Sequence, residues 1–464
     1  MPMFSETADV EPRESRTGAV WFRRDLRLEG NPAWAQATNN HDRVVGIFVL
    51  EPSLIDAAGA RRRDALFANL RALDARLRQL GGGLSVRAGP ATTTVPSMVS
   101  ECSGGALYVN RDQSPFARSR DAAVSLAVEA PVIQLDGSTV HAPGAVLTRA
   151  GSLSKVFTPF YRRWIETPIE PWPEPGPAEV FELPGKGVPA PSEQPGFQPG
   201  EAGASARLEE WLEMVDQYGE SRDLLADSGT SMLSADLHFG TVSARAVVER
   251  VGNATEGRAA FVRQLAWRDW WAHTLADQPD LPRRSIGAGY DRIDWTNDPR
   301  DIAAWEGGRT GFPVVDAAMN QLLQTGWMHN RARMIAASFL VKDLLVDWRH
   351  GERFFRRHLV DGDVAQNAGN WQWVAGTGPD AAPYFRVFNP TTQARKFDPG
   401  GDYIRRWVPE LAALAPPHIH EPAAAPVDVL EAAGVRLGHT YPHPIVDHSL
   451  ARERVIHAYK AALG

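Results

Sequence analysis

Short apolar runs alternate with a helical pattern in the first third of the chain. The runs cover residues 19–22, 44–50, 106–109 and 132–135, and each has the length and composition of a buried strand. Between the second and third runs, leucines recur at steps of three and four residues, on one helix face, at Leu66, Leu70, Leu73, Leu77 and Leu80. Three glycines at 81–83 end this helix as a C-cap. The alternation predicts a parallel, doubly wound α/β sheet.

The strand pattern disappears in the second half of the chain. The segment from Pro168 to Gly203 is rich in proline and glycine, which is typical of an ordered linker on the surface. After Arg207, helical patterns dominate, at residues 259–276, 314–324, 329–346 and 352–359. We therefore expect four parts: a flexible N-terminus over residues 1–15, an α/β domain over 16–140, a linker over 141–205 and an all-α domain over 206–464.

The amino-acid composition restricts the cellular location and the kinds of binding partner that we expect. The 464 residues include one cysteine, Cys102, which excludes an intramolecular disulfide and a cysteine-based metal cluster and favours a reducing, cytoplasmic environment. The first residues lack the apolar segment of a secretory signal, and no apolar run has the length of a membrane span. The net charge of −7 argues against nonspecific binding to nucleic acid, although it is compatible with a local basic groove.

The turn after the first strand bears on cofactor binding. It reads Arg23-Arg-Asp-Leu-Arg-Leu28, where a dinucleotide-binding α/β domain carries glycines. We therefore do not expect this domain to hold NAD or FAD in the Rossmann manner.

Acidic, amide and aromatic residues are concentrated in one short window of the helical part. Asp361 and Asp363 precede Asn367, Trp371 and Trp373. Carboxylates and an amide can set the charge and protonation of a flavin ring, while tryptophans can pass electrons or stack on bases. A metal site is the alternative, but the histidines at positions 329, 350 and 358 lack a zinc-binding spacing. The window therefore predicts a redox-cofactor and aromatic-substrate site without a metal.

Other segments are candidates for the same site. Arg333 can form a buried ion pair with an aspartate of the window, an arrangement better suited to managing a cofactor charge than to stability; a solvated arginine is the alternative. Residues 229–234 form a hydroxyl-rich turn that can hold a pyrophosphate or simply cap a helix. Trp267 and Trp373 can grip a flat substrate or belong to the core. The arginines around them suit a nucleic-acid phosphate track.

These residues lie in motifs that resemble the photolyase/cryptochrome family, over about residues 19–459. The motifs that carry the resemblance are Val20-Trp-Phe-Arg-Arg-Asp-Leu-Arg-Leu28, Val156-Phe-Thr-Pro-Phe160, residues 309–319, Gly326-Trp-Met-His-Asn-Arg331, residues 361–378 and Phe388-Asn-Pro-Thr-Thr-Gln393. Within the family, the chain is similar to the class I cyclobutane pyrimidine dimer DNA photolyases. The resemblance implies an α/β N-terminal domain joined by a long linker to an all-α FAD-binding domain.

The resemblance also implies a non-covalent FAD that works in its reduced form, FADH⁻. The positions that match its binding residues are Tyr218, Thr230, Ser231, Met232, Leu233, Ser234, Phe261, Asp361, Gly362 and Asp363. Arg333 with Asp361 matches the ion pair beside the flavin ring, and Asn367 matches the residue that faces flavin N5. An amide there can accept or donate a hydrogen bond. Three tryptophans match the chain that photoreduces the cofactor: Trp371, Trp348 and Trp295.

The implied substrate is a pyrimidine dimer flipped out of UV-damaged DNA; flipping by photolyases is an established example of this behaviour. The dimer pocket matches Gln264, Trp267, Asn330, Met334 and Trp373, and the DNA contacts match Arg222, Arg268, Arg331, Arg386 and Gln393. The implied reaction is light-driven: excited reduced FAD donates an electron, the cyclobutane ring splits and the electron returns. We expect a monomer without an obligate protein partner or membrane contact, in the cytoplasm and at the nucleoid when bound to DNA.

Departures from the family pattern define the alternatives. Gln264 stands where many members carry Glu, and Met232 stands where Arg is common. A (6-4) photoproduct photolyase would need histidines where Asn330 and Met334 stand. A cryptochrome photoreceptor would carry a long tail, and plant-type members place Asp at position 367. We also expect an antenna chromophore near Arg23, the turn at residues 51–52 and residues 110–112, with 8-hydroxy-5-deazaflavin favoured over methenyltetrahydrofolate.

Overall fold

The computed structural model describes residues 17–227, 229–381 and 383–464, so the expected flexible N-terminus at 1–15 lies outside the described residues. Its first part is a six-stranded parallel sheet of β1 (Thr17–Trp21), β2 (Arg43–Leu50), β3 (Leu84–Ala88), β4 (Gly104–Asn110), β5 (Val132–Leu135) and β6 (Glu179–Phe181). The strands follow the order β3-β2-β1-β4-β5, and β6 pairs with the start of β2. The four predicted strands are confirmed, and β3 and β6 are additional.

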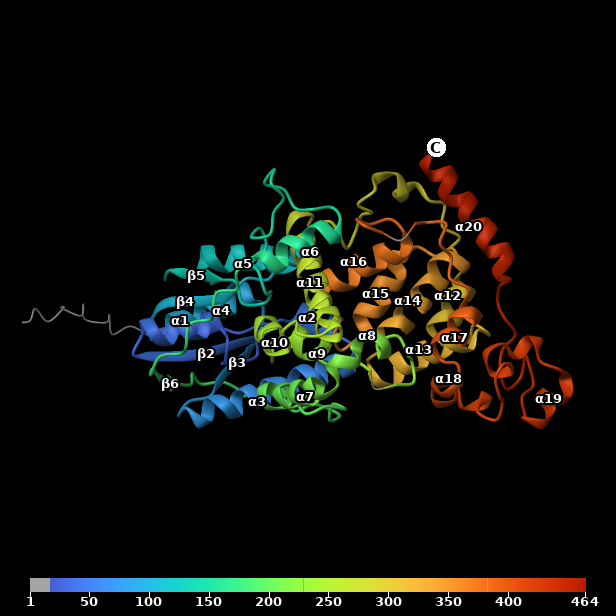
Figure 1. Ribbon diagram of the computed structural model, residues 1–464. Helices are drawn as coiled ribbons and strands as arrows, with labels where there is room; N and C mark the ends of the chain where they lie inside the picture. Colours follow the sequence, from blue (N-terminus) through green and yellow to red (C-terminus); the bar gives the residue numbers. More distant parts are fainter. Residues whose placement is uncertain (1–16, 228, 382) are drawn as a thin grey trace, which may run out of the picture.

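Helices cover both faces of this sheet (Figure 1). They are α1 (Pro32–Asn40), α2 (Pro52–Ala57), α3 (Ala60–Gln79), α4 (Ala91–Glu101) and α5 (Pro115–Ala127). Successive residues of β1 point to opposite faces, so Val20 packs with α1 and α3 while Trp21 packs with α4 and α5. After α3, Gly81 has a positive φ of 96°, and the Gly82 N–H bonds to the Leu77 carbonyl at 3.2 Å. The predicted doubly wound sheet and the glycine C-cap are both confirmed.

The segment expected to be a linker carries structure of its own. It contains α6 (Phe157–Glu166) and β6, which adds a strand to the sheet of the first domain. The Gly176 N–H donates to the Thr38 hydroxyl at 2.9 Å, and the Leu183 N–H donates to the Ser85 hydroxyl at 2.8 Å. A strand of three residues is too short to show a periodicity in the sequence. The expected linker is therefore partly built into the sheet, and its boundaries stay a prediction.

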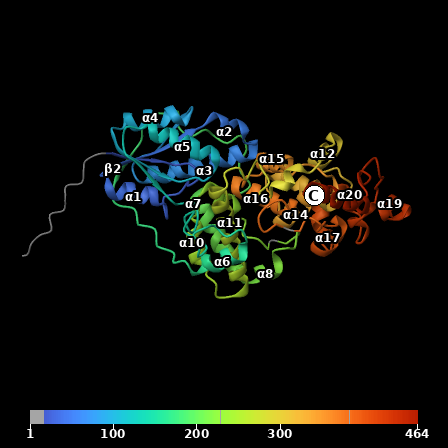
Figure 2. The ribbon, with the colours of Figure 1, turned by 90° about the horizontal axis from the view of Figure 1, so that it is seen from above.

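The rest of the chain is helical and lies beside the sheet domain, with α7, α10 and α11 between the two parts (Figures 1 and 2). The α-helices are α7 (Gly200–Met214), α8 (Tyr218–Ser221), α9 (Ser234–Phe239), α10 (Ala244–Val251), α11 (Glu256–Asp277), α12 (Pro299–Glu306), α13 (Pro313–Thr325), α14 (Asn330–Ser338), α15 (Trp348–His358), α16 (Val364–Ala375), α17 (Pro390–Phe397), α18 (Asp402–Trp407), α19 (Val427–Ala432) and α20 (His448–Leu463). Short 3-10 segments lie at η1 (Val215–Gln217), η2 (Ala288–Arg292), η4 (Pro409–Leu411), η5 (His418–His420) and η6 (Pro422–Ala424), and a π-helical turn, η3 (Phe339–Asp343), continues α14.

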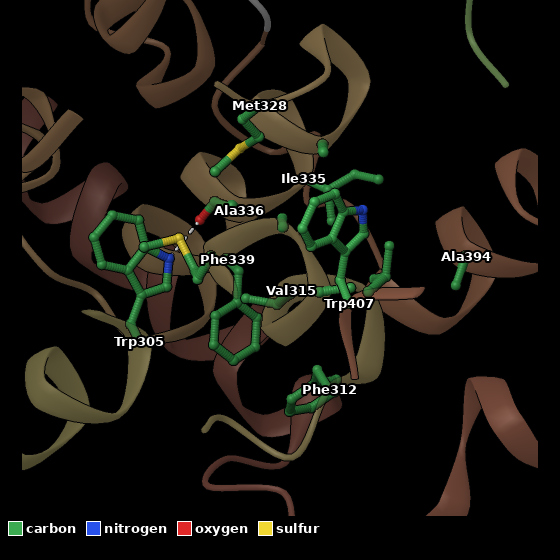
Figure 3. Packing of buried hydrophobic residues seen from close by; sticks show 14 of the residues in the cluster. Trp305, Phe312, Val315, Met328, Ile335, Ala336, Phe339, Ala394 and Trp407 are labelled. Carbon is green, nitrogen blue, oxygen red and sulfur yellow. Dashed lines mark hydrogen bonds between the residues drawn. The ribbon is translucent and has the colours of Figure 1, made fainter. Parts of the chain in front are cut away.

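The largest apolar cluster fills the centre of the helical domain (Figure 3). Trp305 of α12 is fully buried in it, and its indole N–H donates to the Ala336 carbonyl at 3.0 Å. This core positions α14, α15 and α16, which carry most of the predicted site residues. Within the described residues, no helix is both long enough and apolar enough to cross a membrane.

Candidate functional site

A buried ion pair joins α14 to the turn before α16. The two terminal nitrogens of Arg333 donate to the two carboxylate oxygens of Asp361 at 3.1 and 2.8 Å, and Nε donates to the Met328 carbonyl at 2.8 Å. Burial raises the pKa of Asp361, but Arg333, with the Ser234 hydroxyl, outweighs this effect and holds that pKa below its usual range. The predicted pair is therefore confirmed, and its place beside a flavin stays a prediction.

Asp363 binds a cation of the other domain. Its carboxylate forms an ion pair with Arg24, in the turn after β1, and accepts the Gln366 N–H at 2.8 Å as the N-cap of α16. Burial raises the pKa of Asp363, but Arg24, Arg268 and the Gln366 N–H together outweigh this effect and hold that pKa below its usual range. Arg24 also lies 3.6 Å from Asp112. The Asp363 carboxylate therefore joins the two domains. The flavin contact predicted for Asp363 stays a prediction.

The hydroxyl-rich turn lies next to the buried pair. The Ser234 hydroxyl hydrogen-bonds the Asp361 carboxylate and accepts the indole N–H of Trp327 at 3.3 Å. Among the described residues, the other two hydroxyls bond within the turn: Thr230 to the Met232 sulfur at 3.7 Å, and Ser231 to the Leu233 N–H at 3.3 Å. These groups keep spare hydrogen-bonding capacity beside Asp361, as a phosphate or ribityl group would require.

Unsatisfied polar groups around the pair fit a polar, flat ligand. Within the described chain, His238 Nδ1 is buried without a partner, and Arg62 forms no ion pair and one bond, to the Gly362 carbonyl at 3.1 Å. Buried polar groups are normally satisfied in a native protein. Tyr218 and Phe261 meet edge to face at 5.4 Å and add an aromatic wall. The donor set and the wall therefore suit a flavin nucleotide.

The Asn367 amide, on α16, is bound on one side. Its Nδ2 donates to the Glu352 carbonyl at 2.7 Å and to a Glu352 carboxylate oxygen at 3.0 Å. Glu352 is 1% exposed on the inner face of α15, and burial raises its pKa. No described residue donates to Asn367 Oδ1, so the amide oxygen remains available to a ligand.

The three tryptophans predicted to pass electrons lie in or against one core. Trp371 and Trp348 are buried in the largest apolar cluster, and Trp295 packs against it. The Trp295 ring meets Tyr459 of α20 at 6.0 Å between centroids, so the last helix packs against it. Gly351 allows α15 to approach Trp371, since an added Cβ would lie 2.1 Å from the indole. The electron path along these tryptophans stays a prediction.

The two tryptophans predicted to grip a substrate differ in their surroundings. Trp267 of α11 stacks on Phe157 of α6, with ring centroids 3.8 Å apart and planes 12° from parallel. Only the other face of Trp267 is left for a substrate. Trp373 is half-buried and packs against the two larger apolar clusters of the helical domain.

The polar side chains predicted for the same pocket make few hydrogen bonds within the described chain. Gln264 makes one long bond, to the Ala260 carbonyl at 3.4 Å. Asn330 is exposed, and within the part of the chain that the structure describes its side chain bonds to the Met334 sulfur alone, at 3.8 Å. These side chains can therefore turn towards a ligand at little cost, and their substrate contact stays a prediction.

The predicted phosphate track is only partly at the surface. Arg268 donates to the carbonyls of Ser138 at 2.7 Å and Leu237 at 3.0 Å, so its guanidinium is held at the domain junction. Arg331 forms an ion pair with Asp223 at 2.9 Å. The two bonds of Arg268 leave some of its N–H donors unused, and the DNA contact predicted for Arg268 stays a prediction. The remaining candidates are exposed or half-exposed: Arg222, Arg386 and Gln393.

Acid should weaken the helix that carries Asn330 and Arg333. His329 caps α14 by accepting the Arg331 N–H on Nδ1 at 3.1 Å, and burial lowers its pKa from 6.5 to about 4. Between these two values the unfolded chain takes up a proton that the folded chain refuses, so we expect the free energy of unfolding to fall as the pH falls from 6.5 to 4. Urea unfolding at several pH values measures this slope. His329→Asn keeps a capping acceptor and should flatten the slope; an unchanged slope would assign it to other groups.

A cavity opens at the domain junction, outside the carboxyl ends of β1 and β4, where the strand order reverses. Its lining includes charged side chains of both domains, among them Arg23, Arg24, Asp112, Arg268 and Asp363. A wider cleft beside α5 shares Arg111 and Asp112 with it. Residues 110–112 and Arg23, where an antenna chromophore is expected, therefore line these spaces. Glu51 lines neither of these two spaces. Its carboxylate accepts the Ala91 N–H at 2.9 Å at the start of α4.

Sequence reasoning missed Arg24 and Glu352 as site residues. Glu352 could have been found, because it shares a helix face with Trp348 and Phe355, and a charged residue on the apolar face of a helix is unusual. Arg24 could not, because its partner Asp363 is 339 positions away and no local pattern reports such a pair.

Two family models match the chain. The model described as DNA photolyase matches residues 19–178, and the model described as the FAD binding domain of DNA photolyase matches residues 261–461. Curated proteins named deoxyribodipyrimidine photo-lyase are similar over nearly the whole length. The Streptomyces griseus protein is 42% identical, covering 94% of this chain and 97% of that protein. The Escherichia coli K12 protein is 40% identical, covering 96% and 99%.

Solved structures show the same fold. A class III photolyase from Agrobacterium tumefaciens has a TM-score of 0.89 and 37% identity, covering 98% of this chain and 99% of that one. The Synechocystis cryptochrome has a TM-score of 0.89 and 27% identity, covering 95% and 99%. A Sulfolobus tokodaii photolyase described with two FAD molecules has a TM-score of 0.84 and 33% identity, covering 96% and 100%.

Proposed function

Because this chain belongs to the DNA photolyase family, we propose that it is a deoxyribodipyrimidine photo-lyase, a light-dependent DNA-repair enzyme with FAD in its helical domain. The observation that carries the proposal is the Arg333–Asp361 pair, buried beside a hydroxyl-rich turn and unsatisfied polar groups. A buried ion pair contributes little to stability, so its presence at the matched cofactor site favours a role in holding charge near the ligand.

The residues of the chain take separate roles in this proposal. Reduced FAD, when bound and excited by light, supplies the electron that splits the cyclobutane ring. Arg333 and Asp361 hold the charge beside the ring system, and Ser234 extends this contact towards the phosphates. The free face of Trp267 and the half-buried Trp373 stack on the flipped dimer. The DNA is contacted by the five residues predicted for this role: Arg222, Arg268, Arg331, Arg386 and Gln393.

Two alternatives are disfavoured by single residues. A (6-4) photoproduct photolyase needs a histidine acid in the pocket, whereas His329 is 2% exposed, has a lowered pKa and uses Nδ1 to cap α14. A photoreceptor of the cryptochrome type shares the fold, as the Synechocystis protein shows. Asn367 and the nearly free pocket residues favour repair. The class I assignment stays a prediction, since one similar structure is a class III photolyase.

For the second chromophore, we place the antenna in the cavity outside β1 and β4. We favour 8-hydroxy-5-deazaflavin over methenyltetrahydrofolate, as the sequence analysis does. A second FAD is a third candidate, because the Sulfolobus tokodaii structure is described with two FAD molecules. Mass spectrometry of the chromophores released from the purified protein distinguishes the three. We also propose that the chain acts as a monomer on UV-damaged DNA in the cytoplasm, at the nucleoid when bound.

The experiment that tests the function is an anaerobic blue-light assay with reduced protein. We expect oligonucleotides carrying a cyclobutane pyrimidine dimer to be restored, and those carrying a (6-4) product to remain unchanged. Parallel samples in the dark measure the light dependence. Turnover of the (6-4) product alone would assign the chain to the other repair class, and turnover of neither lesion would favour a photoreceptor.

A further inference from the structure

A lysine is buried in the helical domain without a carboxylate partner. Lys342 of η3 is 1% exposed, and within the described residues no charged group offsets the cost of its burial. Burial lowers its pKa from 10.5 to about 7. A buried ammonium group that no carboxylate neutralises costs stability unless neutral groups satisfy it. The contacts of Lys342 therefore indicate why it is retained.

The ammonium group of Lys342 joins three parts of the chain. Its Nζ donates to the Ala375 carbonyl, at the end of α16, at 2.8 Å and to the Tyr384 carbonyl at 3.1 Å. The same atom lies 4.2 Å from the centroid of the Tyr459 ring, on α20. An ammonium group has three hydrogens, so two serve the carbonyls and the third is left for the aromatic ring. The cation also lies at the C-terminal end of α16, where the helix dipole is negative.

Tyr384 belongs to the segment at residues 383–389, which leads into α17. Among the described residues, the bond from Lys342 is the only hydrogen bond that the main chain of residues 383–388 receives from outside this segment. The Tyr384 ring also stacks on Tyr459, with centroids 5.7 Å apart and planes 12° from parallel. Phe385, which follows, is 58% exposed, and Arg386 is one of the predicted DNA contacts. A segment with so few anchors opens easily when one of them is lost.

We propose that Lys342 is a positioning residue that fixes the 383–389 segment to the end of α16 and thereby places Arg386 and Phe385 for contact with damaged DNA. This inference rests on the proposed function, which gives Arg386 its DNA contact. Trp373, predicted to stack on the dimer, lies two residues before Ala375 on α16. One ammonium group therefore holds the segment at a set distance from the lesion pocket. Binding costs less entropy, because the segment is ordered before the DNA arrives.

The test compares Lys342→Met with wild type in the FAD-loaded protein. Methionine fills a similar volume and removes both hydrogen bonds, so the segment is released while the core stays filled. We expect the Kd for an oligonucleotide carrying a cyclobutane pyrimidine dimer to rise about tenfold, the effect of one hydrogen bond from a charged group. The repair rate of the reduced protein under light, at saturating DNA, should stay at the wild-type level. Fluorescence anisotropy measures the Kd.

Two further measurements report on the segment itself. Trypsin cleaves after arginine, so cleavage after Arg386 should be faster in Lys342→Met than in wild type, as mass spectrometry of the fragments measures. The slope of log Kd against log salt concentration should become shallower by about one, because a displaced Arg386 no longer neutralises a phosphate. Arg386→Gln should change the slope equally. The double variant should bind little worse than the weaker of the single variants, because both changes remove the same contact.

His448→Ala is the matched control. His448 of α20 pairs with Asp343, the neighbour of Lys342 in η3, at 2.6 Å, and this pair does not involve the 383–389 segment. The variant loosens α20 without removing the Lys342 bonds, so it should keep the wild-type Kd. If Lys342→Met fails to fold, Lys342→Gln takes its place. Its uncharged amide is one bond shorter than the lysine side chain, and the same rise in Kd is expected.

The outcomes separate this inference from the proposed function. A folded Lys342 variant with wild-type Kd, salt slope and trypsin cleavage would overturn the role of Lys342 and leave the proposed function standing. An equal rise in Kd in His448→Ala would also overturn it, because general loosening of α20 would then explain the effect. Loss of repair at saturating DNA, with full FAD content, would overturn it by placing Lys342 in the chemical step. A wild-type protein that takes up no FAD and restores no dimers would overturn both.

Discussion

Replacing Arg333 by methionine lowers the free energy of unfolding by about 3–5 kcal/mol and leaves the purified protein without FAD. The Asp361 side chain is 3% exposed, and Arg333 donates a hydrogen bond to each of its two carboxylate oxygens. Methionine fills a similar volume, so the main effect is an uncompensated buried charge rather than a cavity. Urea unfolding measures the stability, and the ratio of flavin to protein absorbance measures the FAD content.

A second ion pair on the same helix provides the control. Arg331 pairs with Asp223 at 2.9 Å, but that aspartate is 35% exposed. Arg331→Met should therefore cost less than about 1 kcal/mol. The double variant Arg333→Met with Asp361→Asn should be more stable than Arg333→Met alone, because the buried charge is removed with its partner. Equal losses for Arg331→Met and Arg333→Met would contradict the central place given to the buried pair.

Replacing Trp348 by phenylalanine abolishes the photoreduction of oxidised FAD and leaves repair by chemically reduced protein intact. Trp348 is fully buried in the core that also contains Trp371, and phenylalanine is much harder to oxidise than tryptophan. The two activities separate because repair uses an electron that is already on the cofactor. Bleaching of the oxidised flavin band under blue light with an external thiol measures the first activity, and restoration of dimers after dithionite reduction measures the second.

Trp305 is the matched control for this experiment. It is also fully buried, and its ring lies 6.2 Å from that of Trp371, yet it is not part of the predicted electron path. Trp305→Phe should therefore retain photoreduction. Loss of photoreduction in Trp305→Phe and its survival in Trp348→Phe would redirect the path through α12.

Particular residues show how far the sequence predicts the site. The Arg333–Asp361 pair could be anticipated, because both residues lie in family motifs and a buried carboxylate needs a cation. The motifs did not indicate that the Asp363 carboxylate binds Arg24 or that two carbonyls hold Arg268 at the domain junction. These partners come from distant parts of the chain, and no local pattern reports them. The flavin contact of Asp363 and the DNA contact of Arg268 stay predictions.

The sequence by itself determined the doubly wound sheet, the helical second half and the window from Asp361 to Trp373, because strand and helix periodicity are local and the motifs are contiguous. The tertiary structure alone decided which groups those residues meet. It joined β6 to the sheet, placed Arg24 against Asp363 and turned the Asn367 oxygen outwards by means of Glu352. The physical reason is that a hydrogen bond or ion pair depends on distance in space, which the packing of helices sets and the order of residues does not report.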